Sequence, residues 1–307
     1  MTGGVAHVRV PATSANLGPA FDCAGLALAC HDHLEFAVSD GGLSISIEGM
    51  GAGELPTDES HLVVRAFRAA CDELGWHPPG LRLAARNEIP QGRGMGSSAA
   101  AVVAGIAGAW ALCPDVAEQD DEAVLRLADR IEGHPDNVAA CLLGGATLSY
   151  LRPDGAAAVR LDVDPRVLPV VLVPEATLAT HVARGLLPDA VPHADAAANA
   201  GRAALLVRAL TAEPALLFDA TEDRLHQRQR ASAMPDSWAL LERLRDAGHA
   251  AVVSGAGPSL VVLAQRRPDG EDVPGIAALV TEGWRVLPLS VDSEGARVVR
   301  EARVSSG

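Results

Sequence analysis

Lysine is absent from this chain, and all 25 basic residues are arginine. The absence excludes mechanisms that need a lysine side chain, such as Schiff-base catalysis or a Walker A phosphate loop. Long uncharged apolar runs are also absent, because the best candidate, residues 99–113, is too short and too rich in alanine and glycine to span a membrane. The first residues lack a basic region followed by an apolar block. We therefore expect no export signal and no membrane partner.

A surplus of basic residues is missing as well, since 25 basic residues face 39 acidic ones and the formal net charge is −14. A nucleic-acid partner is not expected, because such a partner needs a basic face. An anionic small molecule remains possible in a locally positive pocket. The five cysteines form no CxxC pair and no short metal-binding spacing, so buried, inert thiols in a reducing cytoplasm are expected.

The length of 307 residues favours two domains of about 150 residues each. Strands and helices are mixed without strict alternation, which predicts an α+β fold rather than a doubly wound sheet. The residue pattern changes after "RPDG", at residues 152–155, so we expect one domain at residues 1–155 and another at 156–307. Periodicity predicts strands at 5–10, 25–38, 43–48, 81–87, 147–151, 167–173, 250–254, 260–264 and 285–289, and a loop at 11–22. It predicts helices at 60–74, 97–112, 122–131, 194–210, 237–246 and 276–281, with a short helix after "EGHPDN".

The most unusual stretch is "PQGRGMGSSAAAVVAGIAGA", at residues 90–109, which has hardly a side chain larger than valine. A glycine-rich loop that runs directly into a helix presents free backbone N–H groups at the positive end of the helix dipole. Such an arrangement binds phosphate. Ser97 and Ser98 stand where hydroxyls can cap the helix, touch phosphate oxygens or reach a magnesium ion.

Three other interpretations of this stretch are weighed against phosphate binding. A Walker A loop fails, because Gly96 is followed by Ser97 rather than lysine. A dinucleotide-binding fingerprint fits poorly, since Gly92, Gly94 and Gly96 give G-x-G-x-G rather than G-x-G-x-x-G. The loop could also have a purely structural role, as a tight turn before a helix of small packing residues.

Further segments arrive in a fixed order along the chain. "PATSANLGPAFD" (11–22), "PQGRGMGSSAAA" (90–101) and "VSGAGPSL" (253–260) resemble the three motifs of the GHMP small-molecule kinases. Between them, "IEGHPDNVAA", "TLATHVARGLLP" and "EDRLHQRQR" resemble the homoserine kinase branch of that family. The resemblance implies an N-terminal domain like ribosomal protein S5, a ferredoxin-like C-terminal domain and an active site in the cleft between them.

The resemblance also implies that ATP is held through the second motif by backbone contact, with no lysine required. The residues that it assigns to this contact are Pro90, Gln91, Gly92, Arg93, Gly94, Met95, Gly96, Ser97, Ser98, Ala99 and Ala100. Magnesium prefers hard oxygen ligands, and by resemblance these ligands are Ser98 and Glu132. Several other GHMP kinases have an aspartate base where this chain has Asn137. Because an amide cannot accept the proton, the homoserine branch is expected to work by positioning and transition-state stabilisation.

The implied substrate is L-homoserine, which the enzyme would convert to O-phospho-L-homoserine on the route to threonine. A substrate carboxylate calls for arginine, and the matching positions are Arg184 and Arg230. Thr180 lies four residues before Arg184, so both would share one helical face. The remaining substrate-binding positions implied by the motifs are Asn16, Asp22, His134 and Asp136. Without the motifs, His134 could equally be a histidine whose hydrogen bonds are satisfied within the fold. Arg184 and Arg230, taken singly, could each be a solvated surface charge.

Two alternatives stay open from the sequence. In the first, the chain is a GHMP kinase for another alcohol, such as mevalonate or a sugar. In the second, it is a GHMP-fold protein that binds a ligand and regulates without catalysis. The presence of the loop serines, Glu132 and Asp136 argues against the second alternative. A homodimer is a family expectation only.

Overall fold

The computed structural model describes residues 4–267 and 270–301. Its first half contains β1 (Val5–Ala15), β2 (Ala24–Ser39), β3 (Gly42–Gly49), α1 (Leu62–Leu74), β4 (Gly80–Asn87), α2 (Ser97–Leu112), α3 (Asp121–Glu132), α4 (Pro135–Leu143), β5 (Ala146–Arg152) and β6 (Gly155–Leu161). The rest contains β7 (Val167–Pro174), α5 (Thr180–Arg184), α6 (His193–Thr211), α7 (Leu217–Ala220), α8 (Gln227–Arg230), α9 (Pro235–Asp246), β8 (Ala251–Val253), β9 (Leu260–Arg267), β10 (Gly270–Glu271), α10 (Val273–Leu279), β11 (Trp284–Pro288) and β12 (Arg297–Glu301). Two short 3₁₀ helices, Pro214–Leu216 and Ala231–Ala233, precede α7 and α9.

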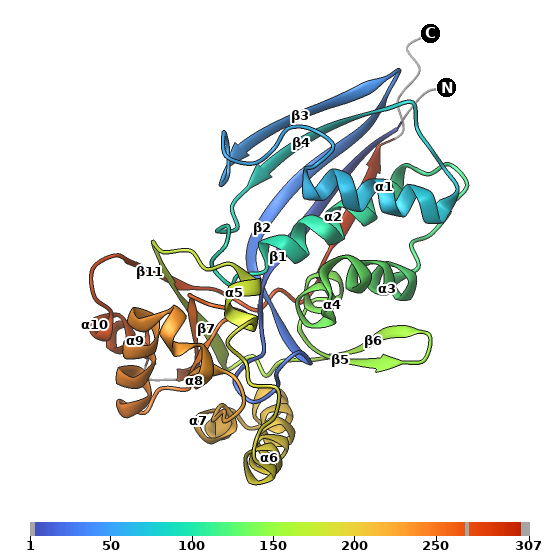
Figure 1. Cartoon of the computed structure of the whole chain (residues 1–307). Coiled ribbons are helices and arrows are strands. Elements are labelled where there is room, and N and C mark those ends of the chain that lie inside the picture. The colour runs from blue at the N-terminus through green and yellow to red at the C-terminus, as the bar shows by residue number, and fades with distance from the viewer. Residues whose placement is uncertain (1–3, 268–269, 302–307) are drawn as a thin grey trace.

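The larger sheet has the strand order β12-β1-β2-β4-β3, and β5 joins it by pairing with both β2 and β6. Its pairs are antiparallel except for β3 and β4, which run parallel. Helices α1 and α2 cover one face of this sheet, and α3 and α4 lie beside the hairpin of β5 and β6 (Figure 1). The mixture of helices with a mainly antiparallel sheet agrees with the expected α+β class.

Helix α2 is buried around almost its whole circumference, which explains its lane of alanine and glycine. A Cβ atom at Gly105 would lie 2.3 Å from the backbone oxygen of Val63 in α1. A Cβ atom at Gly108 would lie 2.8 Å from the ring of Phe36 in β2. The small residues therefore let α2 pack directly against a helix and the sheet, and its N-terminus is held in one place. Within residues 4–267 and 270–301, no helix, α2 included, is long and apolar enough to cross a membrane.

The smaller sheet has the strand order β10-β9-β7-β11, with β8 also paired to β9. Strand β7 is buried along its whole length, as expected for a continuous apolar run between two layers. Helices α8, α9 and α10 lie beside this sheet, and α6 and α7 lie at the other end of this half of the molecule (Figure 1). A second apolar cluster, which includes Leu172, Leu240, Leu244 and Leu260, forms between the sheet and α9.

The division of the chain at residue 155 stays a prediction, but sheet pairing shows which segments cross it. Strand β6, which begins at Gly155, pairs with β5, and the C-terminal strand β12 returns to pair with β1. In Figure 1 the red strand β12 accordingly lies beside the blue strand β1. The first half of the fold is thus completed by strands from beyond the expected boundary.

The loop predicted at residues 11–22 is only partly a loop, because β1 continues to Ala15. The strand passes a register shift between Pro11 and Ala12 and then pairs again with β2. The sequence suggested a loop because this segment is dense in proline, serine and asparagine. Its Thr13 and Ser14 are nevertheless fully buried, since their hydroxyls have partners inside the fold.

Candidate active site

A cavity of about 440 Å³ lies where α1, α2 and α4 meet α5, α8 and the loop after β8. This volume falls within the range of small-molecule sites. The predicted site residues that line it are Asn16, Gln91, Gly92, Arg93, Gly94, Gly96, Ser97, Ser98, Ala100, Glu132, His134, Asp136, Asn137, Thr180, Arg184 and Arg230. Pro90, Met95 and Ala99 do not line it but are buried beside it. Asp22 is also outside the lining and reaches it through Arg184.

The glycine loop is held against the cavity by both other glycine- and serine-rich motifs. Gly94 and Gly96 have φ values of 70°, a conformation that favours glycine. Thr13 donates its backbone N–H to Met95 O at 3.0 Å, and the Ser254 hydroxyl donates to Gly94 O at 2.6 Å. The first, second and last motifs of the sequence are therefore in direct contact.

The loop ends at Gly96, from which α2 starts with Ser97. Among the described residues, no side chain accepts a hydrogen bond from the N–H groups of the first turn of α2. Gly96, Ser97 and Ser98 all line the cavity. The uncapped N–H groups and the positive end of the helix dipole therefore form an anion-binding position.

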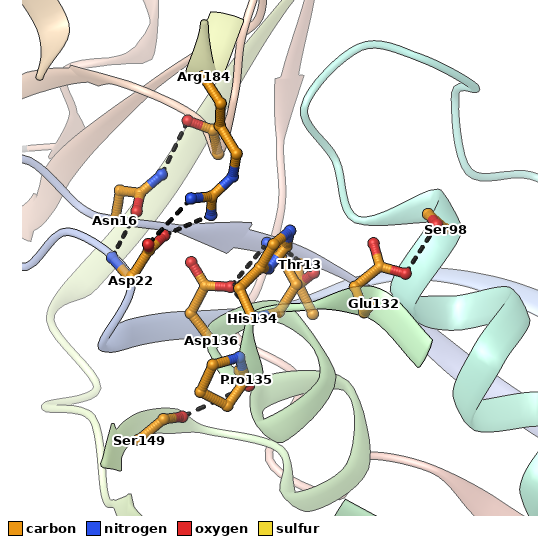
Figure 2. Close-up of polar contacts among 12 residues, drawn as sticks. Thr13, Asn16, Asp22, Ser98, Glu132, His134, Pro135, Asp136, Ser149 and Arg184 are labelled. Carbon is orange, nitrogen blue, oxygen red and sulfur yellow. Dashed lines mark hydrogen bonds and ion pairs between the residues drawn. The ribbon is translucent and has the colours of Figure 1, made fainter. Parts of the chain in front are cut away.

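The side chains of Ser98 and Glu132 meet at the start of α2, as Figure 2 shows. The Ser98 hydroxyl donates to Glu132 Oε2 at 2.9 Å. Glu132 is the last residue of α3, and Gly133 ends that helix in the left-handed conformation. Burial raises the pKa of Glu132, although the hydrogen bond from Ser98 opposes the shift.

The pair of oxygens fits a magnesium ion that takes its other ligands from phosphates and water. Magnesium typically binds one or two protein carboxylates together with substrate phosphates. Within the described ranges, no cluster of three or more histidine, cysteine, aspartate or glutamate side chains could hold a metal by itself.

His134, Asp136 and Asn137 form the start of α4. His134 Nδ1 donates to Asp136 Oδ1 at 2.8 Å, and the backbone N–H of Asn137 donates to the same oxygen at 2.8 Å. Burial lowers the pKa of His134, but the hydrogen bond to Asp136 and its charge outweigh burial and raise the pKa above its ordinary value. In Figure 2 the side chains of His134 and Asp136 lie between the Arg184–Asp22 pair and the Ser98–Glu132 pair.

Arg184 and Asp22 form a two-pronged ion pair, which lies apart from the Ser98–Glu132 pair in Figure 2. Arg184 Nη1 donates to Asp22 Oδ2 at 3.0 Å, and Nη2 donates to Oδ1 at 2.5 Å. The guanidinium carbon also lies 5.4 Å from the centre of the Phe21 ring, a cation–π arrangement. The hydrogen bond with Asp22 raises the pKa of Arg184. The expected helical turn exists as α5, so Thr180 and Arg184 both face the cavity.

Asn16 fixes the carboxylate end of this ion pair. Its Oδ1 accepts the backbone N–H of Asp22 at 2.9 Å, and its Nδ2 donates to Gly255 O at 2.9 Å. Asn16 and Asp22 have positive φ values of 70° and 55°, which asparagine and aspartate tolerate better than most residues. Asn16 therefore links the turn after β1 to the loop after β8.

Arg230 is the least expected of these side chains, because it is only 1% exposed. Its Nη1 donates to Gly255 O at 2.9 Å, its Nε donates to His226 O at 3.3 Å, and Nη2 donates to His226 Nδ1. Burial lowers the pKa of Arg230 to about 10. These contacts hold the guanidinium at the cavity wall and leave N–H groups for a ligand.

His226 supports Arg230 and was not among the predicted site residues. Its Nδ1 accepts from Arg230 while its Nε2–H donates to Gly18 O at 2.6 Å. Burial, together with the charge of Arg230, lowers the pKa of His226 to about 4, although the charge of Asp223 opposes the shift. The neighbouring Gln227 accepts the backbone N–H of Val253 at 2.7 Å. The segment "EDRLHQRQR" is therefore tied to both glycine-containing loops beside it.

The sequence did not predict the apolar part of the cavity. It is lined by apolar side chains that include Leu34, Leu55, Leu62, Val63 and Ala101. Buried polar residues of the lining near them in the chain include Asp32, His61 and Asn87. Neither ring nitrogen of His61 has a hydrogen-bond partner within residues 4–267 and 270–301. No motif marks His61 in the sequence, since it simply precedes an ordinary amphipathic helix.

Comparison with known proteins places the chain in a family. Residues 61–145 match the GHMP kinases N terminal domain, and residues 196–276 match the GHMP kinases C terminal domain. The chain is 54% identical over 300 residues to homoserine kinase of Streptomyces coelicolor, covering 97% of this chain and 96% of that protein. It is 55% identical over 294 residues to homoserine kinase of Streptomyces avermitilis, covering 95% of each chain.

A solved structure agrees with this placement. The crystal structure of homoserine kinase from Cytophaga hutchinsonii superposes with a TM-score of 0.81 at 27% identity, covering 96% of this chain and 97% of that one. The expected GHMP kinase fold is thereby confirmed. The chain belongs to the GHMP kinase family and, within it, to the homoserine kinases.

Proposed function

We propose that this chain transfers the γ-phosphoryl group of ATP to the side-chain hydroxyl of L-homoserine, with Mg²⁺ as cofactor. The homoserine kinases of two Streptomyces species support the reaction, since each aligns with this chain over almost its whole length. The observation that carries the proposal is the cavity itself. It brings together an uncapped helix N-terminus, a serine–glutamate pair and an ion pair suited to an amino acid.

The nucleotide's phosphates are assigned to the glycine loop and the first turn of α2. The N–H groups from Gly94 to Ser98 replace the lysine that other phosphate loops use. The adenine base is assigned to the apolar end of the cavity, where His61 offers ring nitrogens that lack a protein partner in the described chain. Burial lowers the pKa of His61, so the neutral ring would present one donor and one acceptor to the base.

The magnesium ion is assigned to Ser98 and Glu132. When bound there, the ion would neutralise charge on the nucleotide's phosphate oxygens. Glu132 supplies the negative charge for this contact, and Ser98 holds that carboxylate in place through its hydroxyl. Because this pair lies next to the start of α2, metal and phosphates would share one end of the cavity.

The amino-acid substrate carries an ammonium and a carboxylate, and the pair Asp22–Arg184 matches both. The two side chains neutralise each other when no substrate is bound. An incoming zwitterion would place its ammonium against Asp22 and its carboxylate against Arg184, with Arg230 as the second cationic contact. The site then stays charge-balanced with and without substrate, which limits the desolvation cost of binding.

The chemical step forms a bond between the homoserine oxygen and the γ-phosphorus and breaks the bond to the bridging oxygen of ADP. The hydroxyl proton must leave, and Asn137 cannot accept it because an amide is not a base. Asp136 already accepts hydrogen bonds from His134 and from Asn137, so it serves to orient them. These groups therefore act by positioning, and the proton leaves through phosphate oxygen or water.

A coupled assay of ADP release tests the proposal with homoserine, threonine, serine and mevalonate as acceptors. Turnover is expected with homoserine in the presence of ATP and magnesium. Activity on mevalonate alone would assign the chain to another acceptor, and ATP binding without turnover on any alcohol would favour a regulatory role. The expected homodimer and cytoplasmic location stay predictions, which light scattering and cell fractionation would check.

A further inference from the structure

Thr13 is a buried residue that contacts the active site without lining it. It is 0% exposed, and its hydroxyl donates to Asn137 Oδ1 at 2.8 Å. Asn137 lies 124 residues later in the chain and lines the cavity, whereas Thr13 does not. The hydrogen bond of the Thr13 hydroxyl therefore reaches the cavity through Asn137.

Together with Asp136, the Thr13 hydroxyl determines which way the Asn137 amide faces. Asn137 Nδ2 lies 3.3 Å from Asp136 Oδ1, an acceptor that would repel a carbonyl oxygen in the same place. Asn137 Oδ1 must then face Thr13, and the hydroxyl satisfies it by donating. In this orientation the amide can offer its remaining N–H to the cavity.

Thr13 also holds the glycine loop from beneath. Its backbone N–H donates to Met95 O at 3.0 Å. A Cβ atom on Gly96 would lie 1.9 Å from Thr13 Oγ1 and 3.2 Å from Asn137 Oδ1. The hydrogen bond between Thr13 and Asn137 is thus packed directly against the residue from which α2 begins. One side chain sets the distance between the phosphate-binding turn and the amide.

We propose that Thr13 is a positioning residue whose hydroxyl fixes the Asn137 amide with its N–H toward the phosphoryl group in transfer. This inference rests on the proposed phosphoryl transfer. A fixed N–H dipole stabilises negative charge on that group in the transition state. Without the hydroxyl, Oδ1 is a buried acceptor that lacks a donor, and the amide turns or tilts to find one.

Kinetics of Thr13→Val, Thr13→Ser and Thr147→Val test the proposal. Thr147 is a matched control, because it is 1% exposed and its hydroxyl has no hydrogen-bond partner in the described part of the chain. Thr13→Val is expected to lower kcat about 100-fold, the scale of a misplaced catalytic contact. Its KM values for homoserine and ATP should stay within about twofold of wild type. Thr13→Ser keeps the hydroxyl and should restore most of kcat, and Thr147→Val should behave as wild type.

A double variant separates positioning from simple destabilisation. If Thr13 acts through Asn137, adding Thr13→Val to Asn137→Ala should lower kcat no further than Asn137→Ala alone. An equal additional loss in the double variant would overturn the proposal, as would a Thr13→Val enzyme with wild-type kcat.

A second measurement does not depend on turnover. The side-chain amide resonances of Asn137, identified by their loss in Asn137→Ala, should shift or double in Thr13→Val and stay in place in Thr147→Val. Unchanged resonances in Thr13→Val would refute the role of Thr13. A wild-type chain that phosphorylates no alcohol would end the proposed function instead, while the amide resonances would still decide whether Thr13 orients Asn137.

Discussion

The Ser98 hydroxyl donates a hydrogen bond of 2.9 Å to Glu132 Oε2, which joins the first turn of α2 to the last residue of α3. Glu132 is partly buried, and burial raises its pKa, so its carboxylate is incompletely solvated. A divalent cation at this position would restore its charge balance. At the proposed metal site, cation and carboxylate would therefore stabilise each other.

Glu132→Gln is expected to lower kcat about 100-fold, because the neutral amide keeps the shape but loses the charge that binds the metal. The dependence of rate on magnesium concentration should also move to higher concentrations. ADP release measured across a magnesium titration checks both effects.

The matched control for this variant is Glu122→Gln, a change on the exposed side of the same helix. The exposed Glu122 side chain forms ion pairs with Arg126 and Arg152, and such surface ion pairs contribute little to stability. Its kinetics should remain those of wild type. A Glu132→Gln enzyme with an unchanged magnesium titration would remove Glu132 from the metal site.

Arg184→Ala is expected to raise the KM for homoserine about 10- to 100-fold, the scale of a lost charged hydrogen bond, with a smaller change in kcat. Arg184→Lys should recover little, because an ammonium cannot make the forked contact seen with Asp22. Steady-state kinetics with homoserine varied at saturating ATP measure the effect. Arg208→Ala, an exposed arginine of α6, is the control. A fall in kcat at constant KM would instead place Arg184 on the transferring phosphoryl group.

The glycine loop shows what a sequence can predict about this fold. Positive φ values at Gly94 and Gly96 favour glycine, and the helix that follows is marked by its small residues, so both features are local. The buried state of Arg230 is not local. Arginine is usually exposed, and only the fold brings His226 and Gly255 to its guanidinium.

Thr13 and His61 show why other site residues escaped prediction. Thr13 meets Asn137 across 124 residues of chain, and no spacing rule links two positions that far apart. His61 is distinguished only by what it lacks, namely hydrogen-bond partners inside the described fold. The strand character of residues 11–15 was hidden for a related reason, since polar side chains that are satisfied in the interior resemble loop residues in the sequence.

His61→Ala is expected to raise the KM for ATP about tenfold, as for the loss of one hydrogen bond in a buried site, and to leave the KM for homoserine unchanged. The measurement is ADP release with ATP varied at saturating homoserine. His77→Ala serves as control, because His77 follows the same helix but is exposed. If His61→Ala changed the KM for homoserine and not that for ATP, the base would not occupy the apolar end of the cavity.

The last prediction concerns the pH dependence of stability. The pKa of His226 is lowered from 6.5 to about 4 by burial and by the charge of Arg230. Between these pH values the unfolded chain takes up a proton that the folded His226 refuses, so its contribution to stability is lost as the pH falls. Each such proton changes the free energy of unfolding by at most about 1.4 kcal/mol per pH unit. The His226→Gln variant should therefore lose less stability than wild type on acidification from pH 6.5 toward 4, as measured by urea unfolding.

His134→Gln provides the contrast, because the pKa of His134 is raised by Asp136 and the sign reverses. The stabilising contribution of His134 is present below its unfolded pKa of about 6.5 and disappears as the pH rises through the folded value. Removing His134 should thus lower the free energy of unfolding at pH 6 and change it little at high pH. Removing His226 should instead reduce the loss of stability between pH 6.5 and 4. Identical pH curves for the two variants would contradict the assigned environments of both histidines.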